Sequence, residues 1–269
     1  MGGETAVDGF EPEALAAAGL VMAPGDLPYP AMPAPAYRPV VAANWRLDRA
    51  FIVAAPGYFT GPRPLDWMNA LLVRDGRTWM SLVPGEMESQ MPHLAAARGT
   101  VVVCGLGMGV MAYAVSARTA VERLVVVEKD PEVVAMFHEF AGFEAWPQRA
   151  KIEIVEADAR EVRVDGVDFL YADIWPCYRM DCMVPDMQAI QGNIKAPRCG
   201  YWGQELDMVD RARAKGVAFE DFGAAHVCDF IAETGLPLIG LEEPRYPELC
   251  RRAAANPAIG AKRRPVARD

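Results

Sequence analysis

The sequence of 269 residues has little of what a metal site or a disulfide framework needs. It contains three histidines, His93, His138 and His226, and none of its six cysteines forms a C-x-x-C pair. Zinc sites and disulfide scaffolds are usually marked by closely spaced cysteines and histidines. We therefore expect neither a bound metal nor disulfides.

The chain also lacks an excess of positive charge. It has 27 Lys and Arg residues against 36 Asp and Glu, which gives a net charge of −9. Proteins that bind nucleic acids need a surplus of Lys and Arg on some face to neutralise phosphates. We expect no nucleic-acid partner, and a small or cationic substrate fits the charge better.

No targeting or membrane segment is visible. Residues 1–5 lack the basic and apolar regions of a signal peptide, and Ala6 breaks the myristoylation pattern. The uncharged run over residues 100–117 is long enough for a membrane span, but its three glycines and β-branched start favour a strand, a turn and a helix. The sequence thus predicts a cytoplasmic protein with no membrane partner.

A glycine-rich stretch is the most informative part of the chain. The valines at 101–103 indicate a strand buried on both faces, and Gly105, Gly107 and Gly109 separate this strand from a helix expected over 110–118. Glycine adopts conformations closed to other residues and lets a ligand approach the amides of a helix N-terminus. The alternative is a glycine joint that binds nothing.

The next apolar run, over residues 124–127, ends on Glu128. It lies about 20 residues after the turn, where dinucleotide-type folds place a carboxylate that binds ribose hydroxyls. The G-x-G-x-x-G pattern of NAD sites would need glycine at position 110, and the chain has Val110 there. We therefore expect a nucleoside site of a different kind.

The G-x-G-x-G spacing resembles motif I of the class I S-adenosylmethionine-dependent methyltransferase superfamily. The apolar Val103 before it is similar to the spermidine-synthase-like branch. The resemblance covers about residues 70–180. It implies an α/β, Rossmann-like, doubly wound fold with a mostly parallel sheet and helices on both faces. It also implies that Gly105, Gly107 and Gly109 bind S-adenosylmethionine or its decarboxylated form.

The resemblance assigns further contacts to this cofactor. Glu128 would bind the ribose, and Asp158, after a third strand over 151–155, would accept a hydrogen bond from the adenine amino group. Gln90, on a helix expected over 86–97, would touch the methionine end of the ligand. The alternative for this helix is a solvated polar face.

The acceptor side of the resemblance centres on Asp173, which follows the fourth predicted strand and would act as the catalytic carboxylate. Spermidine synthases carry D-x-x-D-P here, whereas this chain has D-x-x-P, so the second carboxylate is missing. Trp175 and Tyr178 would bind substrate as an aromatic wall for a cationic group. Their alternative is burial without function.

We expect three parts in the chain. Residues 1–82 form an N-terminal extension with a proline-rich segment and a β-hairpin that turns at Asp75 and Gly76. Residues 83–250 form the Rossmann-like domain, and residues 251–269 form a basic, disordered tail. The β-hairpin that usually closes a methyltransferase sheet is not visible, so the sheet should be shorter.

Methyl transfer to a small-molecule acceptor, with an amine as one option, is the first functional hypothesis because it is the commonest use of this scaffold. One alternative is transfer of an aminopropyl or aminobutyryl group. Another is a non-catalytic relative that only binds the nucleoside. The hypothesis allows a homodimer, and the sequence does not identify the acceptor.

Overall fold

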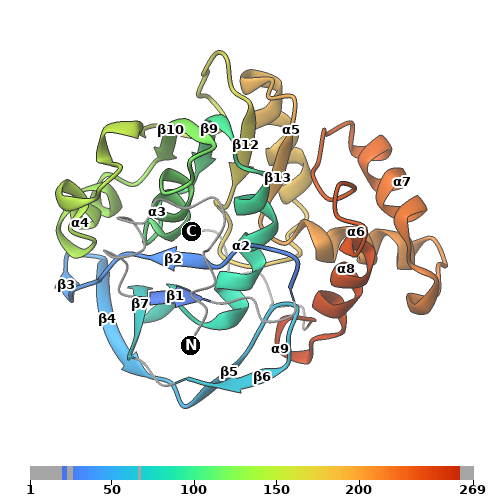
Figure 1. Ribbon diagram of the computed structural model, residues 1–269, viewed down its shortest axis with the longest axis horizontal. Helices are drawn as coiled ribbons and strands as arrows, with labels where there is room; N and C mark the ends of the chain where they lie inside the picture. The colour runs from blue at the N-terminus through green and yellow to red at the C-terminus, as the bar shows by residue number, and fades with distance from the viewer. Residues whose placement is uncertain (1–19, 23–26, 66–67, 261–269) are drawn as a thin grey trace, which may run out of the picture.

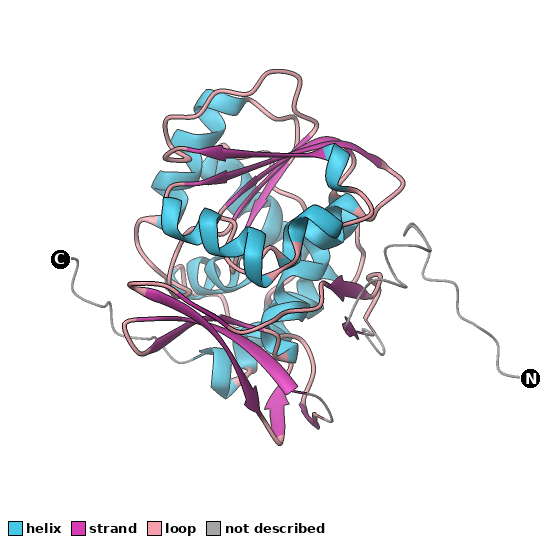
Figure 2. Ribbon diagram, turned by 90° about the vertical axis from the view of Figure 1, so that its left-hand side faces the viewer, coloured by secondary structure: helices cyan, strands magenta, loops and turns pink. Residues whose placement is uncertain are grey.

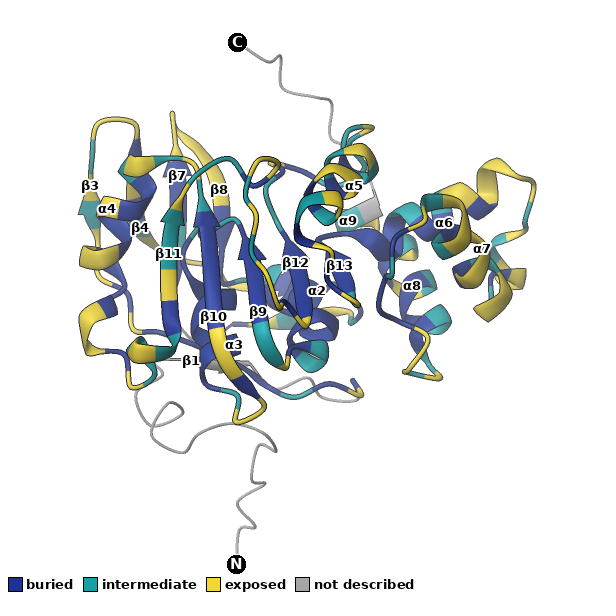
Figure 3. Ribbon diagram, turned by 90° about the horizontal axis from the view of Figure 1, so that it is seen from above, coloured by how far each residue is buried: buried dark blue, intermediate teal, exposed yellow. Residues whose placement is uncertain are grey.

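The computed structural model describes residues 20–22, 27–65 and 68–260. A five-stranded parallel sheet forms its centre, with helices on both faces and an N-terminal β region beside it (Figures 1 and 2). The sheet strands are β9 (Gly99–Cys104), β10 (Val121–Glu128), β11 (Ile152–Glu156), β12 (Phe169–Ala172) and β13 (Cys199–Tyr201). The helices on its faces are α2 (Pro84–Ala96), α3 (Val110–Ser116), α4 (Pro131–Phe140) and α5 (Met183–Ile194). Two further helices, α6 (Gln204–Ala214) and α7 (Ala224–Thr234), lie beyond the β13 edge (Figure 3). The predicted doubly wound α/β fold is confirmed.

The strand order of the sheet is β11-β10-β9-β12-β13, and all neighbours are parallel. The chain builds outward from β9 to β11 and then returns to add β12 on the other side of β9. Open parallel sheets bind ligands beyond their carboxyl strand ends, at the point where the order reverses. The glycine turn follows β9 and Asp173 follows β12, so both lie at this switch point.

The valines of β9 divide between two hydrophobic clusters. Val101 and Val103 belong to a cluster that includes residues of α2, α3 and α4, whereas Val102 belongs to one that includes residues of α5, α6 and α7. All three are at most 1% exposed, and the central strands are coloured as buried along most of their length in Figure 3. The prediction of a strand buried on both faces is confirmed.

The N-terminal region is built mainly of short antiparallel strands. Their bounds are β1 (Leu20–Met22), β2 (Met32–Ala34), β3 (Val40–Val41), β4 (Trp45–Phe51), β5 (Ala54–Pro56), β6 (Pro62–Pro64), β7 (Met68–Arg74) and β8 (Arg77–Ser81). The hairpin between β7 and β8 turns at Asp75 and Gly76, as predicted, and both have positive φ (48° and 75°). Trp45 Nε1 donates to Asp130 Oδ2 at 3.0 Å, which fastens this region to the N-terminus of α4.

The C-terminal part ends differently from the predicted tail. Leu238 forms an isolated parallel bridge with Cys199 of β13, and no closing hairpin follows in the described part of the chain, which agrees with the shorter sheet expected. Two further helices are α8 (Tyr246–Ala255) and α9 (Pro257–Gly260). The disorder predicted for the tail is therefore wrong for residues 251–260, and residues 261–269 lie outside the described part. Among the described helices, none has the length and apolar character needed to cross a membrane.

Candidate active site

The three glycines of the turn all have positive φ, and each is needed for a different contact. A Cβ on Gly105 would clash with the carbonyl oxygen of Asp173, and one on Gly109 would clash with the ring of Phe137 on α4. A Cβ on Gly107 would lie 2.9 Å from the Met80 sulfur. Any other residue at these positions would also be strained at positive φ. The turn is thus packed closely against the Asp173 loop, α4 and β8.

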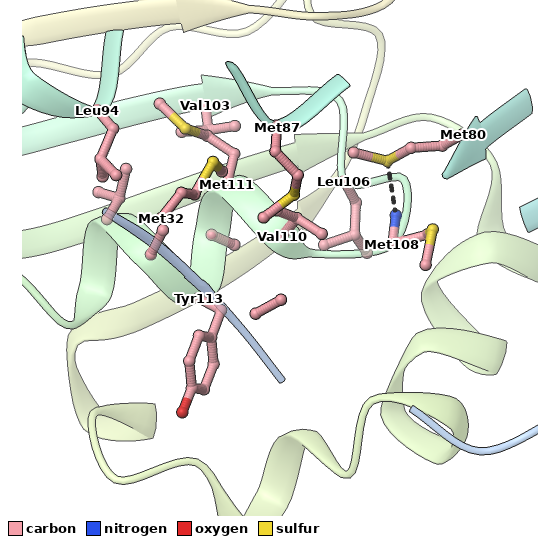
Figure 4. Close-up of a cluster of buried hydrophobic side chains, with 14 of the residues drawn as sticks. Met32, Met80, Met87, Leu94, Val103, Leu106, Met108, Val110, Met111 and Tyr113 are labelled. Carbon is pink, nitrogen blue, oxygen red and sulfur yellow. Dashed lines mark hydrogen bonds between the residues drawn. The ribbon is translucent and has the colours of Figure 1, made fainter. Parts of the chain in front are cut away.

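The amides of the turn are largely occupied by groups of the protein. Leu106 N donates to Glu128 Oε2 at 3.0 Å, and Gly109 N donates to the Leu106 carbonyl at 2.7 Å. Met108 N donates to the Met80 sulfur at 3.4 Å, a contact drawn as the dashed line in Figure 4. A phosphate-binding turn needs several amides that point at the anion. This turn is better suited to a ligand without a phosphate.

Glu128 stands beside the turn in a fixed orientation. Its Oε1 accepts from Lys129 N at 2.8 Å and from Asp130 N at 2.9 Å, in addition to the Leu106 bond on Oε2. An ionised carboxylate has about four acceptor positions. One position on Oε2 is therefore left, and the side chain is only partly buried.

Asp158 follows β11 and is held by a neighbour in sequence. Arg160 donates through Nε to Asp158 Oδ1 at 2.9 Å and through Nη2 to Oδ2 at 2.6 Å. These hydrogen bonds lower the pKa of Asp158 to about 2. The carboxylate is thus ionised and oriented at any neutral pH.

Asp173 occupies a different environment after β12. Its backbone N donates to the Cys104 carbonyl at 2.8 Å, which anchors the loop beside the end of β9. Burial first, and then the nearby Glu86 carboxylate, raise the pKa of Asp173 well above its usual value. Glu86 comes from α2 and supplies a second acidic group that the D-x-x-P motif does not contain.

The polar face of α2 points into the protein. Glu88, Ser89, Gln90 and His93 are fully buried, so the alternative of a solvated face is wrong. Glu88 has a structural task, because it accepts from Phe59 N at 2.9 Å and from Arg63 Nη2 at 3.0 Å. Both polar atoms of the Gln90 side chain lack a hydrogen-bond partner among the described residues.

His93 lies farther along α2 and also has no hydrogen-bond partner among the described residues on either ring nitrogen. Its ring packs against the ring of Tyr171 on β12, with centroids 4.5 Å apart. Burial lowers the pKa of His93 to about 3, so the imidazole is neutral.

The structure separates the two aromatic residues predicted for the acceptor. Tyr178 packs against Trp202 with ring centroids 3.9 Å apart and against Tyr58 at 5.6 Å, and its hydroxyl bonds Ser89. Trp175 lies in the other hydrophobic cluster, where its Nε1 donates to Asp186 Oδ2 at 2.9 Å. Tyr178 thus packs with Trp202 and not with Trp175.

Glu205 on α6 is a buried acidic residue that was not predicted from the sequence. It is fully buried, and it accepts from Tyr246 at 2.9 Å and from Tyr58 at 3.3 Å. Burial is the main cause that raises its pKa to about 7. The Glu205 charge acts on both Tyr171 and Tyr178, as do Asp173 and Glu86. The charges of three carboxyl groups thus help to raise the pKa of both tyrosines.

A cavity of about 400 Å³ opens elsewhere, between α5, α6 and α7. Arg179, Asp207 and Phe230 are among its lining residues, and none of the predicted site residues lines it. At the switch point, the Met80 thioether fills the space against Gly107. A ligand that contacts Gly107 must therefore pack against Met80 or displace it.

No family model and no curated protein matches the sequence. Similar solved structures include spermidine synthase from Thermotoga maritima, with 15% identity over 61% of this chain and 55% of that chain and a TM-score of 0.36. A dimethyladenosine transferase from Plasmodium falciparum has 15% identity over 35% of this chain and 32% of that chain, with a TM-score of 0.28. A PRMT1 enzyme-prozyme complex from Trypanosoma brucei has 17% identity over 40% of this chain and 34% of that chain, with a TM-score of 0.32.

The chain thus spans about a third to a half of the length of these structures. Their names belong to the superfamily and the branch that the glycine motif resembles. Because the TM-scores are below 0.5, the fold is assigned from the strand order and helices of this chain alone.

Proposed function

We propose that this chain binds S-adenosylmethionine at the switch point and transfers its methyl group to a small-molecule amine. The observation that supports this most is the contact between the Gly105 backbone and the Asp173 carbonyl. It puts the backbone of Asp173, and so the start of the loop after β12, directly beside the turn that would hold the nucleoside. The two reactants of an in-line transfer would then lie next to each other.

The polar groups around the turn suit a nucleoside better than a dinucleotide. The turn uses amides of Leu106, Met108 and Gly109 for bonds within the protein, which disfavours a pyrophosphate. Glu128 retains an acceptor position for a ribose hydroxyl. The buried, unpartnered amide of Gln90 suits the amino acid end of the ligand, because such a group is costly unless something bonds it.

Asp173 provides the proton chemistry that an amine acceptor needs. S-adenosylmethionine supplies a carbon that the adjacent sulfonium makes electrophilic, and the attacking nitrogen needs a free lone pair. Because burial raises its pKa, Asp173 in its ionised form is a stronger base than an ordinary aspartate and would accept a proton from the amine. Tyr178 and Trp202 would contact the cationic form of the acceptor through their ring faces.

Glu86 supports a second candidate function. Its charge acts on Asp173, and it would supply the second carboxylate that spermidine synthases have in D-x-x-D-P. Transfer of an aminopropyl or aminobutyryl group therefore stays an alternative. The reaction products identify both the acceptor and the group that is transferred to it.

Product analysis tests these functions. We expect incubation with S-adenosylmethionine and a panel of small amines to release S-adenosylhomocysteine, whereas methylthioadenosine would identify the alternative. No turnover with any amine, together with retained nucleoside binding, would leave a non-catalytic binding protein and reject methyl transfer.

Calorimetry tests the nucleoside site itself. Glu128→Ala should weaken S-adenosylhomocysteine binding by about 1–3 kcal/mol, the range for hydrogen bonds to a charged group. Glu122→Ala is the matched control, because Glu122 is exposed on the same strand. Binding of NAD, or equal affinity in both variants, would contradict the proposed site.

A further inference from the structure

Four side chains form a continuous polar connection across the carboxyl end of the sheet. Arg160 makes two hydrogen bonds to the Asp158 carboxylate, and its Nη1 lies 3.6 Å from Asp186 Oδ1 on α5. Asp186 in turn accepts from Trp175 Nε1 at 2.9 Å. The carbonyl of Arg160 also accepts from Asn193 Nδ2 at 2.7 Å. Arg160 is thus fixed from several directions although its side chain is 43% exposed.

This arrangement leaves Asp158 with a defined acceptor direction. Oδ1 accepts from both the backbone N (3.0 Å) and Nε (2.9 Å) of Arg160, whereas Oδ2 accepts only from Nη2. One position on Oδ2 is therefore left for a ligand. An ionised carboxylate can only accept, so it pairs with an amino group and repels a carbonyl oxygen at the same place. The low pKa of Asp158 keeps it in this form.

We propose that Arg160, held by Asp186 and Trp175, is a positioning residue that makes Asp158 selective for a purine with a 6-amino group. The proposal rests on the nucleoside site proposed above. Without the guanidinium, the Asp158 side chain would be free to rotate, and its acceptor positions would no longer point in one direction. A 6-amino and a 6-oxo purine would then differ less in affinity. The role of Trp175 is to orient Asp186 through its indole N–H, and not to contact the acceptor.

The test compares S-adenosylhomocysteine with its 6-oxo, inosine-type counterpart by calorimetry on the full chain. We expect the wild-type chain to prefer the amino form by about tenfold or more, because a site built for one hydrogen-bonding group rejects the analogue that lacks it. R160M should reduce this preference by about tenfold, mainly through weaker binding of the amino form. If Arg160 acts through the Asp158 carboxylate, it should have no effect once that carboxylate is gone. Adding Arg160→Met to Asp158→Asn should therefore not reduce the preference for the amino form any further.

Two further variants sharpen the result. Arg123→Met is the matched control, since it removes an exposed arginine whose partner, Glu153, lies on the neighbouring strand, and it should leave the preference unchanged. Trp175→Phe keeps a ring but removes the N–H, so it should reduce the preference in the same direction and by less than R160M does.

The outcomes separate the two proposals. If the wild-type chain binds neither compound, the nucleoside site is rejected and this inference with it. If it binds with a clear preference that R160M does not change, the nucleoside site stands and the role of Arg160 is overturned. An unchanged preference in Trp175→Phe would remove Trp175 and Asp186 from the connection.

Discussion

The acidic groups on the two sides of the switch point differ in their surroundings. On one side, hydrogen-bond donors hold the carboxyl groups in place, and on the other side burial raises their pKa. Glu128 accepts hydrogen bonds from three backbone amides. Both oxygens of the Asp158 carboxylate accept hydrogen bonds from the Arg160 guanidinium. Asp173 and Glu205 instead have raised pKa values that burial causes first. The side that we propose to bind the nucleoside therefore has its carboxyl groups oriented before any ligand binds. The acceptor side keeps groups whose protonation a ligand can change.

This difference follows from where each carboxylate comes from. Glu128 and Asp158 bond mostly to residues next to them in the chain, and local backbone amides are always available at a strand end. Glu205 bonds to Tyr58 and Tyr246, which are 147 and 41 residues away in the sequence. Long-range packing gives burial without guaranteeing donors, and burial favours the neutral acid. The carboxyl ends of one sheet thus carry two kinds of acidic group, one held by local hydrogen bonds and one buried by long-range packing.

Gly107→Val should have the largest effect, which is loss of detectable S-adenosylhomocysteine binding in a folded chain. The new side chain would sit at φ +51° and press on Met80 where the ligand must approach. Gly216→Val is the matched control, because Gly216 has φ +87° but no atom within 4 Å of its Cβ. A Gly107→Val protein that is folded by circular dichroism and binds normally would make the turn a structural joint only.

Asp173→Asn should reduce turnover by about 10²–10⁴-fold, the span for a lost acid-base group, with cofactor affinity nearly unchanged. The amide cannot take a proton from the amine, and the backbone of residue 173 that packs beside Gly105 is unchanged. Asp181→Asn, an exposed position farther along the same loop, is the control and should keep full activity. Wild-type turnover in Asp173→Asn, or joint loss of cofactor binding and activity, would place Asp173 outside the acceptor site.

The sequence predicted the strand, glycine turn, helix and strand around Glu128 well because their signals are local. The valine run, the alternating glycines and the position of Glu128 all lie within one strand-turn-helix-strand unit, and the structure forms that unit. The Asp75–Gly76 turn was equally visible, since its chemistry belongs to two adjacent residues.

The acceptor side could not be predicted in the same way. Glu86 and Asp173 become neighbours only because α2 packs over the sheet, and no spacing in the sequence marks that contact. Trp175 and Tyr178 are three residues apart but face opposite clusters, which depends on the path of the loop after β12. The basic residues at 262–264 suggested a tail over residues 251–269, but α8 continues to Ala255, and its Cys250 and Ala253 are buried in the core.

Glu205→Gln should have the smallest effect. We expect it to change how the free energy of unfolding depends on pH. The pKa of Glu205 is about 7 in the folded chain and about 4.5 when unfolded, so between these values the folded state binds more protons. Stability therefore falls as pH rises through this window, by up to about 3 kcal/mol from this group. Glutamine does not titrate, and the variant should lack this part of the pH dependence and be more stable than wild type at pH 8. Urea unfolding between pH 4 and pH 8 measures the difference, with Glu122→Gln as an exposed control. A wild-type minus variant difference that does not change with pH would show that Glu205 is ionised in the folded chain throughout, and the acceptor side would then carry a permanent buried charge.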